Sequence, residues 1–183
     1  MSLPQPQGNP HSSQNSQPSP GNAATSVKDA CVMQIRPFHS DDQEAVISLW
    51  RRCNLVRAWN DPAKDIHRKL QIRPDLFLVG LIGGQIIGSV MAGYEGHRGW
   101  LNYLAVDPEH QRQGYARAIV DEAERLLREA GCPKINLQVR TSNHEVIEFY
   151  RRIGYSDDEV VSLGKRLEHD EKKLQNGKSN VEC

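Results

Sequence analysis

The sequence predicts an α/β fold in which about four helices flank a mixed, mostly antiparallel sheet. Residues 77–82 and 85–91 are β-rich runs on either side of Gly83-Gly84, and a Gly-Gly pair is a strong signal for a two-residue hairpin turn. A long amphipathic helix over 116–130 connects two further β-rich runs, which indicates a right-handed crossover between parallel strands. Antiparallel and parallel neighbours together make the sheet mixed.

Residues 33–38 open the pattern with a strand, and two helices follow before the hairpin. Ser40 and Gln43 have the spacing of a capping box that begins the first helix. The apolar side chains after it share one helical face, at Ala45, Val46, Leu49, Trp50 and Cys53. Pro62 is well placed for the first turn of a second, shorter helix that ends near Gln71.

Residues 100–106 add a third antiparallel strand to the hairpin. The long helix after it carries apolar residues three or four positions apart, at Ala116, Ile119, Val120, Ala123, Leu126, Leu127 and Ala130. Gly131 ends this helix, and residues 135–139 predict a buried strand. The last helix has one apolar face, formed by Val146, Ile147, Tyr150 and Ile153. Residues 160–163 predict a final strand that closes the sheet.

A chain of 183 residues has room for one ordinary domain. Of its first 30 residues, 20 are Pro, Ser, Gln, Asn or Gly, and such a segment cannot bury enough apolar surface to offset the entropy of ordering it. We therefore expect a disordered low-complexity tail over 1–31, one folded domain over 32–167 and a polar tail over 168–183.

The charge balance excludes several classes of protein. Lys and Arg number 23, as do Asp and Glu, so no overall basic field exists to collect nucleic acid or anionic lipid. No apolar run approaches the roughly 18 residues of a membrane span, and the N-terminus lacks the order of a secretory signal. The four cysteines include no CxxC pair, which disfavours a zinc site. We expect a soluble, cytoplasmic protein with no metal and no nucleic-acid or membrane partner.

The residues that carry chemistry lie between the strand at 100–106 and the long helix. There the sequence reads Gln111-x-x-Gly114-x-Ala116. The first amides of a helix have no internal partner and carry the positive end of the helix dipole, so this junction could hold an elongated diphosphate. The alternative interpretation is a plain strand-to-helix turn in which Gly114 serves packing.

This spacing resembles the acetyl-CoA pyrophosphate loop of the GNAT N-acetyltransferases, which is Gln or Arg, two residues, Gly, one residue, then Gly or Ala. Asn143 followed by Phe149-Tyr150-Arg-Arg-Ile-Gly154-Tyr155 resembles the second signature of the family. The element order from 33 to 167 is similar as well. Within the family, the segments 57–62, 93–99 and 162–167 resemble small bacterial YpeA-type acetyltransferases.

The resemblance implies an N-acetyltransferase that moves an acetyl group from acetyl-CoA, its co-substrate, to a primary amine by direct attack in a ternary complex. It also implies that strands 101–106 and 135–139 splay apart to receive the pantetheine arm. The implied cofactor-binding residues are Leu104, Ala105, Val106, Gln111, Arg112, Gln113, Gly114, Tyr115, Ala116, Arg117, Asn143 and Tyr150. Arg112 and Arg117 have the alternative of being solvated surface, and Asn143 that of being only a helix cap.

Tyr150 matches the family position that donates a proton or hydrogen bond to the departing thiolate, or else it is a core aromatic residue. The base is less defined. Gln138 stands where the ribosomal-protein alanine N-acetyltransferases have a glutamate, and glutamine cannot take up a proton. Glu95 and His97 are the nearest suitable side chains, and a water chain is the alternative.

The acceptor is expected to be an amine on a small molecule or a peptide. Its site is expected to involve Trp59, Asn60, Tyr94 and His97, with Asp61 and Asp65 beside Trp59. Two other functions remain open: protein N-terminal acetylation of the alanine type, and a regulatory module that binds CoA without catalysis. Because the family often pairs through sheet edges, a homodimer is a further expectation.

Overall fold

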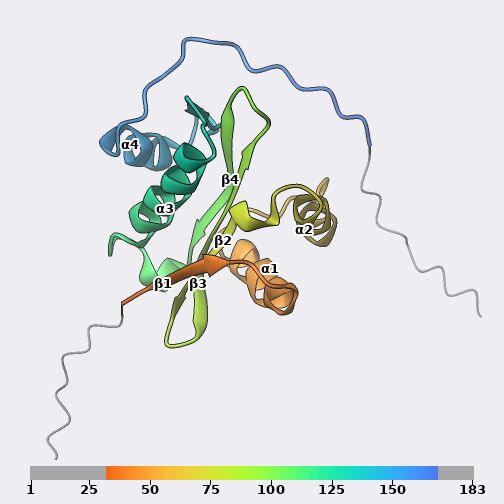
Figure 1. Ribbon diagram of the computed structural model, residues 1–183, viewed down its shortest axis with the longest axis vertical. Helices are drawn as coiled ribbons and strands as arrows, with labels where there is room; N and C mark the ends of the chain where they lie inside the picture. The colour runs from red at the N-terminus through yellow and green to blue at the C-terminus, as the bar shows by residue number, and fades with distance from the viewer. Residues whose placement is uncertain (1–31, 169–183) are drawn as a thin grey trace, which may run out of the picture. The chain divides into compact units, whose positions relative to one another are not determined.

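A five-stranded sheet in the order β1-β2-β3-β4-β5 forms the centre of the structure, a computed structural model that describes residues 32–168 (Figure 1). The strands are β1 (Gln34–Pro37), β2 (Phe77–Ile82), β3 (Gln85–Tyr94), β4 (Gly99–Val106) and β5 (Ile135–Asn136). The first four are antiparallel neighbours, whereas β5 runs parallel to β4. The predicted mixed sheet, its hairpin at Gly83-Gly84 and its crossover are therefore confirmed.

Helices cover both faces of the sheet (Figure 1). One side carries α1 (Gln43–Arg52) and α2 (Pro62–Leu70), and the other carries α3 (Tyr115–Glu129) and α4 (His144–Arg152). Short 3-10 turns lie at η1 (Ser40–Asp42), η2 (Pro74–Leu76) and η3 (Pro108–His110). Two apolar cores result. Trp50 and Phe77 are buried between α1 and the sheet, and Ile119 and Leu127 are buried between α3 and the sheet.

The start of η1, the turn that leads into α1, corrects the predicted cap. Ser40 and Gln43 do not form the box. Instead, the Asp42 carboxylate accepts a hydrogen bond from the His39 amide at 2.8 Å, one position earlier than expected. Asp42 also pairs with Arg36 of β1 at 2.6 Å, so the turn before α1 is tied to the first strand. The start of α2 is as predicted, with Asp61 accepting from the amides of Ala63 and Lys64.

A β-bulge interrupts β4 halfway along its length. Ser89 pairs with Ala105 and Met91 with Asn102, so two residues of β4 face one residue of β3. One of the two is Tyr103, whose φ of 53° lies in the left-handed region. Tyr103 packs against the α1 core and Leu104 against the α3 core. The bulge thereby directs Tyr103 toward the side of α1 and α2.

The β4 and β5 strands diverge. They pair at Gly99 with Ile135 and at Trp100 with Asn136, and no later pair joins them. The predicted strand over 135–139 is accordingly shorter than expected, with only its first two residues in the ladder, and these are half-buried rather than buried. The rest of β4 faces a gap on the β5 side, as the splayed pair predicts.

The predicted strand over 160–163 is wrong. Residues 156–168 form no strand, and Val160, Val161 and Leu163 are 77%, 85% and 90% exposed. Because β5 has only two residues, it offers too short an edge for a further strand to pair. Side chains alone hold the segment beside β5, since Asp158 accepts from Lys134 and Asn136. In Figure 1 the segment passes from α4 across to the side of α2.

The predicted tails, apart from Glu168, lie outside the described residues. No helix within residues 32–168 is long and apolar enough to cross a membrane. The same residues contain no group of three His, Cys, Asp or Glu side chains that could hold a metal ion.

Candidate active site

The gap between β4 and β5 leaves Leu104, Ala105 and Val106 without a strand partner on the β5 side. Ala105 and Val106 pair with β3 on one side, at Ser89 and Gly88, and no strand pairs with them on the other. Backbone amides and carbonyls that face such a gap require other partners. This is the edge where the sequence predicts that the pantetheine arm binds.

The N-terminus of α3 lies directly after this edge and has no side-chain cap. Gly114 occupies the cap position with φ of 87°, and the first internal bond runs from the Ala118 amide to the Gly114 carbonyl at 3.1 Å. The amides of Tyr115, Ala116 and Arg117 therefore have no acceptor within the helix. A Cβ atom built on Gly114 would meet nothing within 4 Å, so the space beside Gly114 is open. The arrangement suits an anion.

Asp107 anchors the loop between β4 and α3. Its carboxylate is buried, pairs with Arg52 of α1 at 2.6 Å and accepts from the Glu109 amide at 3.1 Å. Burial alone would raise the pKa of Asp107, but these two hydrogen bonds, together with the charges of Arg52 and His110, hold the pKa below its ordinary value. Gln111 donates to the Val106 carbonyl at 3.0 Å and so ties the loop back to β4. Asp107 is not among the residues predicted for the site, although an Asp-Pro pair at a strand end is a turn signal.

The remaining side chains predicted for the cofactor lie around this helix end. Arg112 is 86% exposed and sits 3.6 Å from Glu145. Arg117 pairs with Asp121 on α3 at 3.5 Å, and Gln113 donates to the Glu109 carbonyl at 3.3 Å. Asn143 accepts from the Val146 amide at 3.4 Å, so it caps α4.

Tyr150 of α4 is buried, with its ring edge-on to Phe149 and Tyr155 at centroid distances of 5.1 and 5.3 Å. Burial raises the pKa of Tyr150 to about 12. The ring lines a hollow of about 1580 Å³ between α4, the chain after β5 and residues 156–163. Residues 104–117 do not line this hollow, because it lies on the β5 side of the gap, where no further strand covers the sheet.

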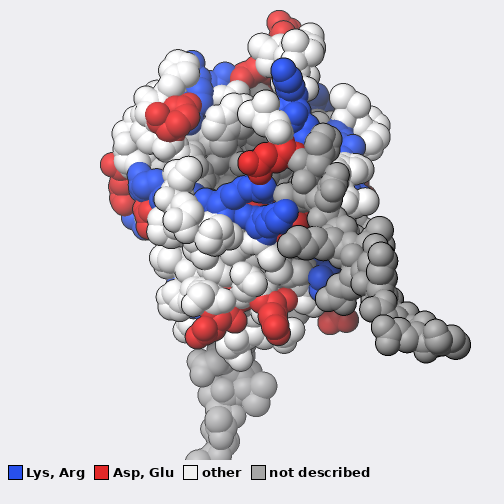
Figure 2. All heavy atoms as spheres, turned by 90° about the vertical axis from the view of Figure 1, so that its right-hand side faces the viewer, with Lys and Arg blue, Asp and Glu red and all other residues white. Residues whose placement is uncertain are grey.

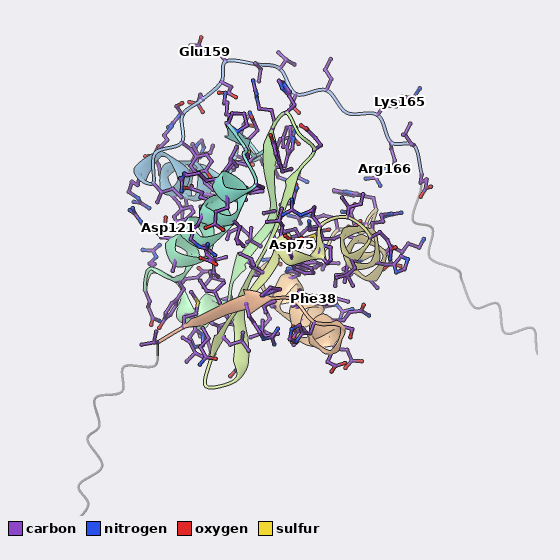
Figure 3. All side chains as sticks on the ribbon, viewed as in Figure 1. Phe38, Asp75, Asp121, Glu159, Lys165 and Arg166 are labelled. Carbon is purple, nitrogen blue, oxygen red and sulfur yellow. The ribbon has the colours of Figure 1, made fainter. Side chains whose placement is uncertain are left out.

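A second group of predicted residues gathers on the side of α2. Trp59 is 50% exposed, and the Arg140 guanidinium lies 6.0 Å from its ring centroid. Arg166 of the C-terminal segment donates to the Trp59 carbonyl at 3.1 Å, and Figure 3 shows it on the α2 side of that segment. Asn60 donates to Asp65 and to the Tyr103 hydroxyl, both at 3.3 Å.

Figure 2 views this face of the molecule. Basic side chains gather there beside a hollow, and acidic side chains lie next to them.

The structure keeps Tyr94, Glu95 and His97 away from the other predicted residues. Glu95 accepts from the amides of His97 and Arg98 at 2.6 and 2.8 Å. The Arg98 amide and then the His97 amide lower the pKa of Glu95, which makes it a weaker base. The Tyr94 hydroxyl donates to the Gly131 carbonyl at the C-terminal end of α3. Along the helix, that end lies about 25 Å from Gly114.

The comparisons with known proteins agree with this fold. The family model described as "Acetyltransferase (GNAT) family" matches residues 43–155. The chain is 51% identical over 138 residues to an acetyltransferase of Pectobacterium atrosepticum, ECA0875, covering 75% of this chain and 98% of that protein. Among solved structures the chain is similar to the aminoglycoside N-acetyltransferase AAC(6')-Iy in complex with CoA, with a TM-score of 0.65 and 19% identity. The match covers 77% of this chain and 99% of that one.

A second solved structure, Ard1 from Thermoplasma volcanium, has a TM-score of 0.57 and 26% identity over 68% of this chain and 82% of that one. The family match spans more than half of the chain and includes both the α3 N-terminus and Tyr150. The chain therefore belongs to the GNAT family and is an acetyltransferase.

Proposed function

We propose that this acetyltransferase moves an acetyl group from acetyl-CoA to a primary amine by direct attack in a ternary complex. The observation that carries the proposal is the gap between β4 and β5, which opens beside the uncapped N-terminus of α3. A long cofactor with a diphosphate at one end and a pantetheine arm needs these two features side by side.

The residues present fit this cofactor. The amides of Tyr115, Ala116 and Arg117 would hold the diphosphate, and the absent side chain at Gly114 leaves room for it. Arg117 and Arg112 would add positive charge in a chain whose formal charge is zero. The bound cofactor supplies an acetyl thioester.

Tyr150 would donate a hydrogen bond to the departing sulfur. With a pKa of about 12 it stays protonated at neutral pH. Full proton transfer to a thiolate whose acid has a pKa of about 8.5 would be uphill by roughly 5 kcal/mol, so Tyr150 stabilises the leaving group rather than supplying its final proton. A backbone amide near Val106 would donate to the oxyanion, because such donors cost no reorganisation.

Calorimetry with acetyl-CoA tests the cofactor site. We expect saturable binding by the pure protein, and the absence of heat at high micromolar ligand would overturn the proposal. Labelled acetyl-CoA with a panel of amines (spermidine, lysine and a peptide with an N-terminal alanine) then tests transfer. Saturable binding without acetylation of any amine would favour the non-catalytic CoA-binding module.

A second candidate function is acetylation of protein N-termini. The stretch from Leu137 to Asn143 supports it. Gln138 weakens it, because its amide donates to Ser162 and cannot serve as a base. Two peptides decide: one with a free N-terminal amine and no lysine, and one with a blocked N-terminus and a single lysine. Preference for the first would establish this candidate.

A further inference from the structure

We propose that Asp65, held by Tyr103 and Asn60, binds the ammonium group of the acceptor and takes up the proton that its nitrogen must lose before attack. This inference rests on the proposed function, since it assigns the missing base of that reaction. It goes beyond the sequence-based candidates Glu95 and His97, neither of which the fold brings to the gap between β4 and β5.

Three separate parts of the chain build the site around Asp65. The Tyr103 hydroxyl of β4 donates to Oδ2 of Asp65 on α2 at 2.6 Å. The Asn60 amide, from the connection before α2, donates to the same Oδ2 and to the Tyr103 hydroxyl oxygen, each at 3.3 Å. These contacts hold the carboxylate toward β4, while its side chain keeps 21% of its surface exposed. An acceptor from solvent can therefore reach it.

The backbone of Tyr103 supports a functional role. A non-glycine residue at φ of 53° costs about 1 to 3 kcal/mol, and such strain persists where the surroundings impose it. The Tyr103 ring stacks on the fully buried Trp50 at 4.1 Å, and the Trp50 indole donates to Ser89 at 2.9 Å. The bulge and the stacking together fix the hydroxyl in front of Asp65.

The position of the bulge connects this site to the cofactor gap. Tyr103 faces α2, whereas Leu104, Ala105 and Val106 follow it along the strand edge that faces the gap. A nitrogen bound at Asp65 would thus approach the acetyl group from the face of the sheet that carries α1 and α2. Two carboxylate-bearing alternatives do not compete, because Glu95 is engaged in a distant turn and Asp61 caps α2.

Charged side chains from three parts of the chain surround Asp65 and Trp59. Arg68 on the same helix pairs with it at 3.0 Å and also reaches Glu168 of the C-terminal segment at 3.2 Å. Arg166 of that segment and Arg140 after β5 lie at Trp59, the neighbour of Asn60. Tyr103 is the titratable group that faces Asp65 from β4.

The proton balance is complete. An ammonium nitrogen carries three protons and the amide product carries one. The first proton passes to Asp65 and then to water, which leaves a neutral amine. As the N–C bond forms and the C–S bond breaks, the second proton leaves the nitrogen through water and ends on the thiol, while Tyr150 supports the sulfur by hydrogen bonding.

The test compares Asp65→Asn with the full-length wild type, using the panel amine that the wild type acetylates fastest. At pH 7 we expect kcat/KM for the amine to fall at least tenfold, with the acetyl-CoA Kd unchanged. In the variant kcat/KM should rise about tenfold per pH unit, because only the neutral amine reacts, and should approach the wild-type value near the pKa of the amine. Tyr103→Phe should mainly raise KM. Asp41→Asn, an exposed carboxylate on η1, is the control and should change nothing.

Three outcomes would overturn the inference. Unchanged kcat/KM in Asp65→Asn would do so, and so would a loss of equal size at every pH, since that pattern indicates a structural role only. A wild type that binds acetyl-CoA but acetylates no amine defeats the proposed function itself, and this inference with it. If the wild type acetylates an amine and Asp65→Asn has the same kcat/KM, the proposed function stands and only this inference is overturned.

Discussion

Trp100 of β4 and Asn136 of β5 form the last pair of the parallel ladder, and beyond this pair the two strands separate. The pair before it, Gly99 with Ile135, closes the narrow end of the gap. A Cβ atom on Gly99 would lie 2.8 Å from the Cys132 sulfur and 3.2 Å from Ile135. The closed end is thus tightly packed, while at the open end β4 has no strand partner on the β5 side.

Gly99→Ala should therefore destabilise the fold. The added methyl group forces Cys132 and Ile135 to shift, which costs about 1 to 3 kcal/mol in a packed interior. Urea unfolding followed by circular dichroism measures this loss. Gly93→Ala is the matched control in the neighbouring strand, where a Cβ would meet nothing within 4 Å. Equal unfolding midpoints for the two variants would contradict the packing argument.

Gly114→Glu should weaken acetyl-CoA binding at least tenfold. The new carboxylate would sit beside the free amides of α3 and compete with the diphosphate for them. Gly131→Glu is the control, because Gly131 lies at the other end of the same helix with a similar φ of 80°. A Cβ atom built on Gly131 would also meet nothing within 4 Å. Both variants carry backbone strain, but only the first should change the Kd in calorimetry. A similar Kd for both would show that the α3 N-terminus does not hold the cofactor.

Tyr150→Phe should lower kcat by about 10- to 100-fold with little change in the acetyl-CoA Kd, because it removes one hydrogen-bond donor from the reaction. The phenyl ring keeps the edge-on contacts with Phe149 and Tyr155. Tyr155→Phe removes a hydroxyl from the same ring cluster, but that hydroxyl donates to Glu124 at 2.9 Å. Steady-state kinetics should therefore separate the two variants, and equal kcat values would exclude Tyr150 from the reaction.

The features that the sequence predicted well depend on local signals. The hairpin follows from Gly83-Gly84, and α3 follows from its apolar spacing and Gly131. Residues 160–163 have the composition of a strand, but a strand also needs an edge to pair with, and β5 is too short to provide one. No local pattern reveals that edge.

The same limit applies to the candidate site. The α3 N-terminus could be predicted because its residues are contiguous. The pairing of Asp65 with Tyr103 and that of Arg52 with Asp107 join residues 38 and 55 positions apart. They depend on how α1 and α2 pack over the sheet and on the bulge in β4. The spacing of polar residues along the chain contains no such information.

Alkaline pH should destabilise the protein through Tyr150 and Tyr155. Burial raises the pKa of Tyr150 to about 12, and burial followed by the contact with Glu124 raises the pKa of Tyr155 as well. An unfolded tyrosine titrates near 10, so the unfolded chain releases these protons first. Stability is therefore fully present below about pH 10 and declines as pH rises through the folded-state values, by up to about 2.7 kcal/mol for a shift of two pKa units.

Urea midpoints at several pH values between about 9 and 11.5 measure this decline. The comparison with Tyr150→Phe and Tyr155→Phe isolates it from the titration of lysines, which all three proteins share. Each variant should lose less stability across the interval than the wild type does, since a phenylalanine has no proton to release. Parallel curves for the wild type and both variants would mean that the two hydroxyls are not shielded from water in the folded protein. The hollow beside Tyr150 would then be filled with solvent rather than suited to a desolvated thioester.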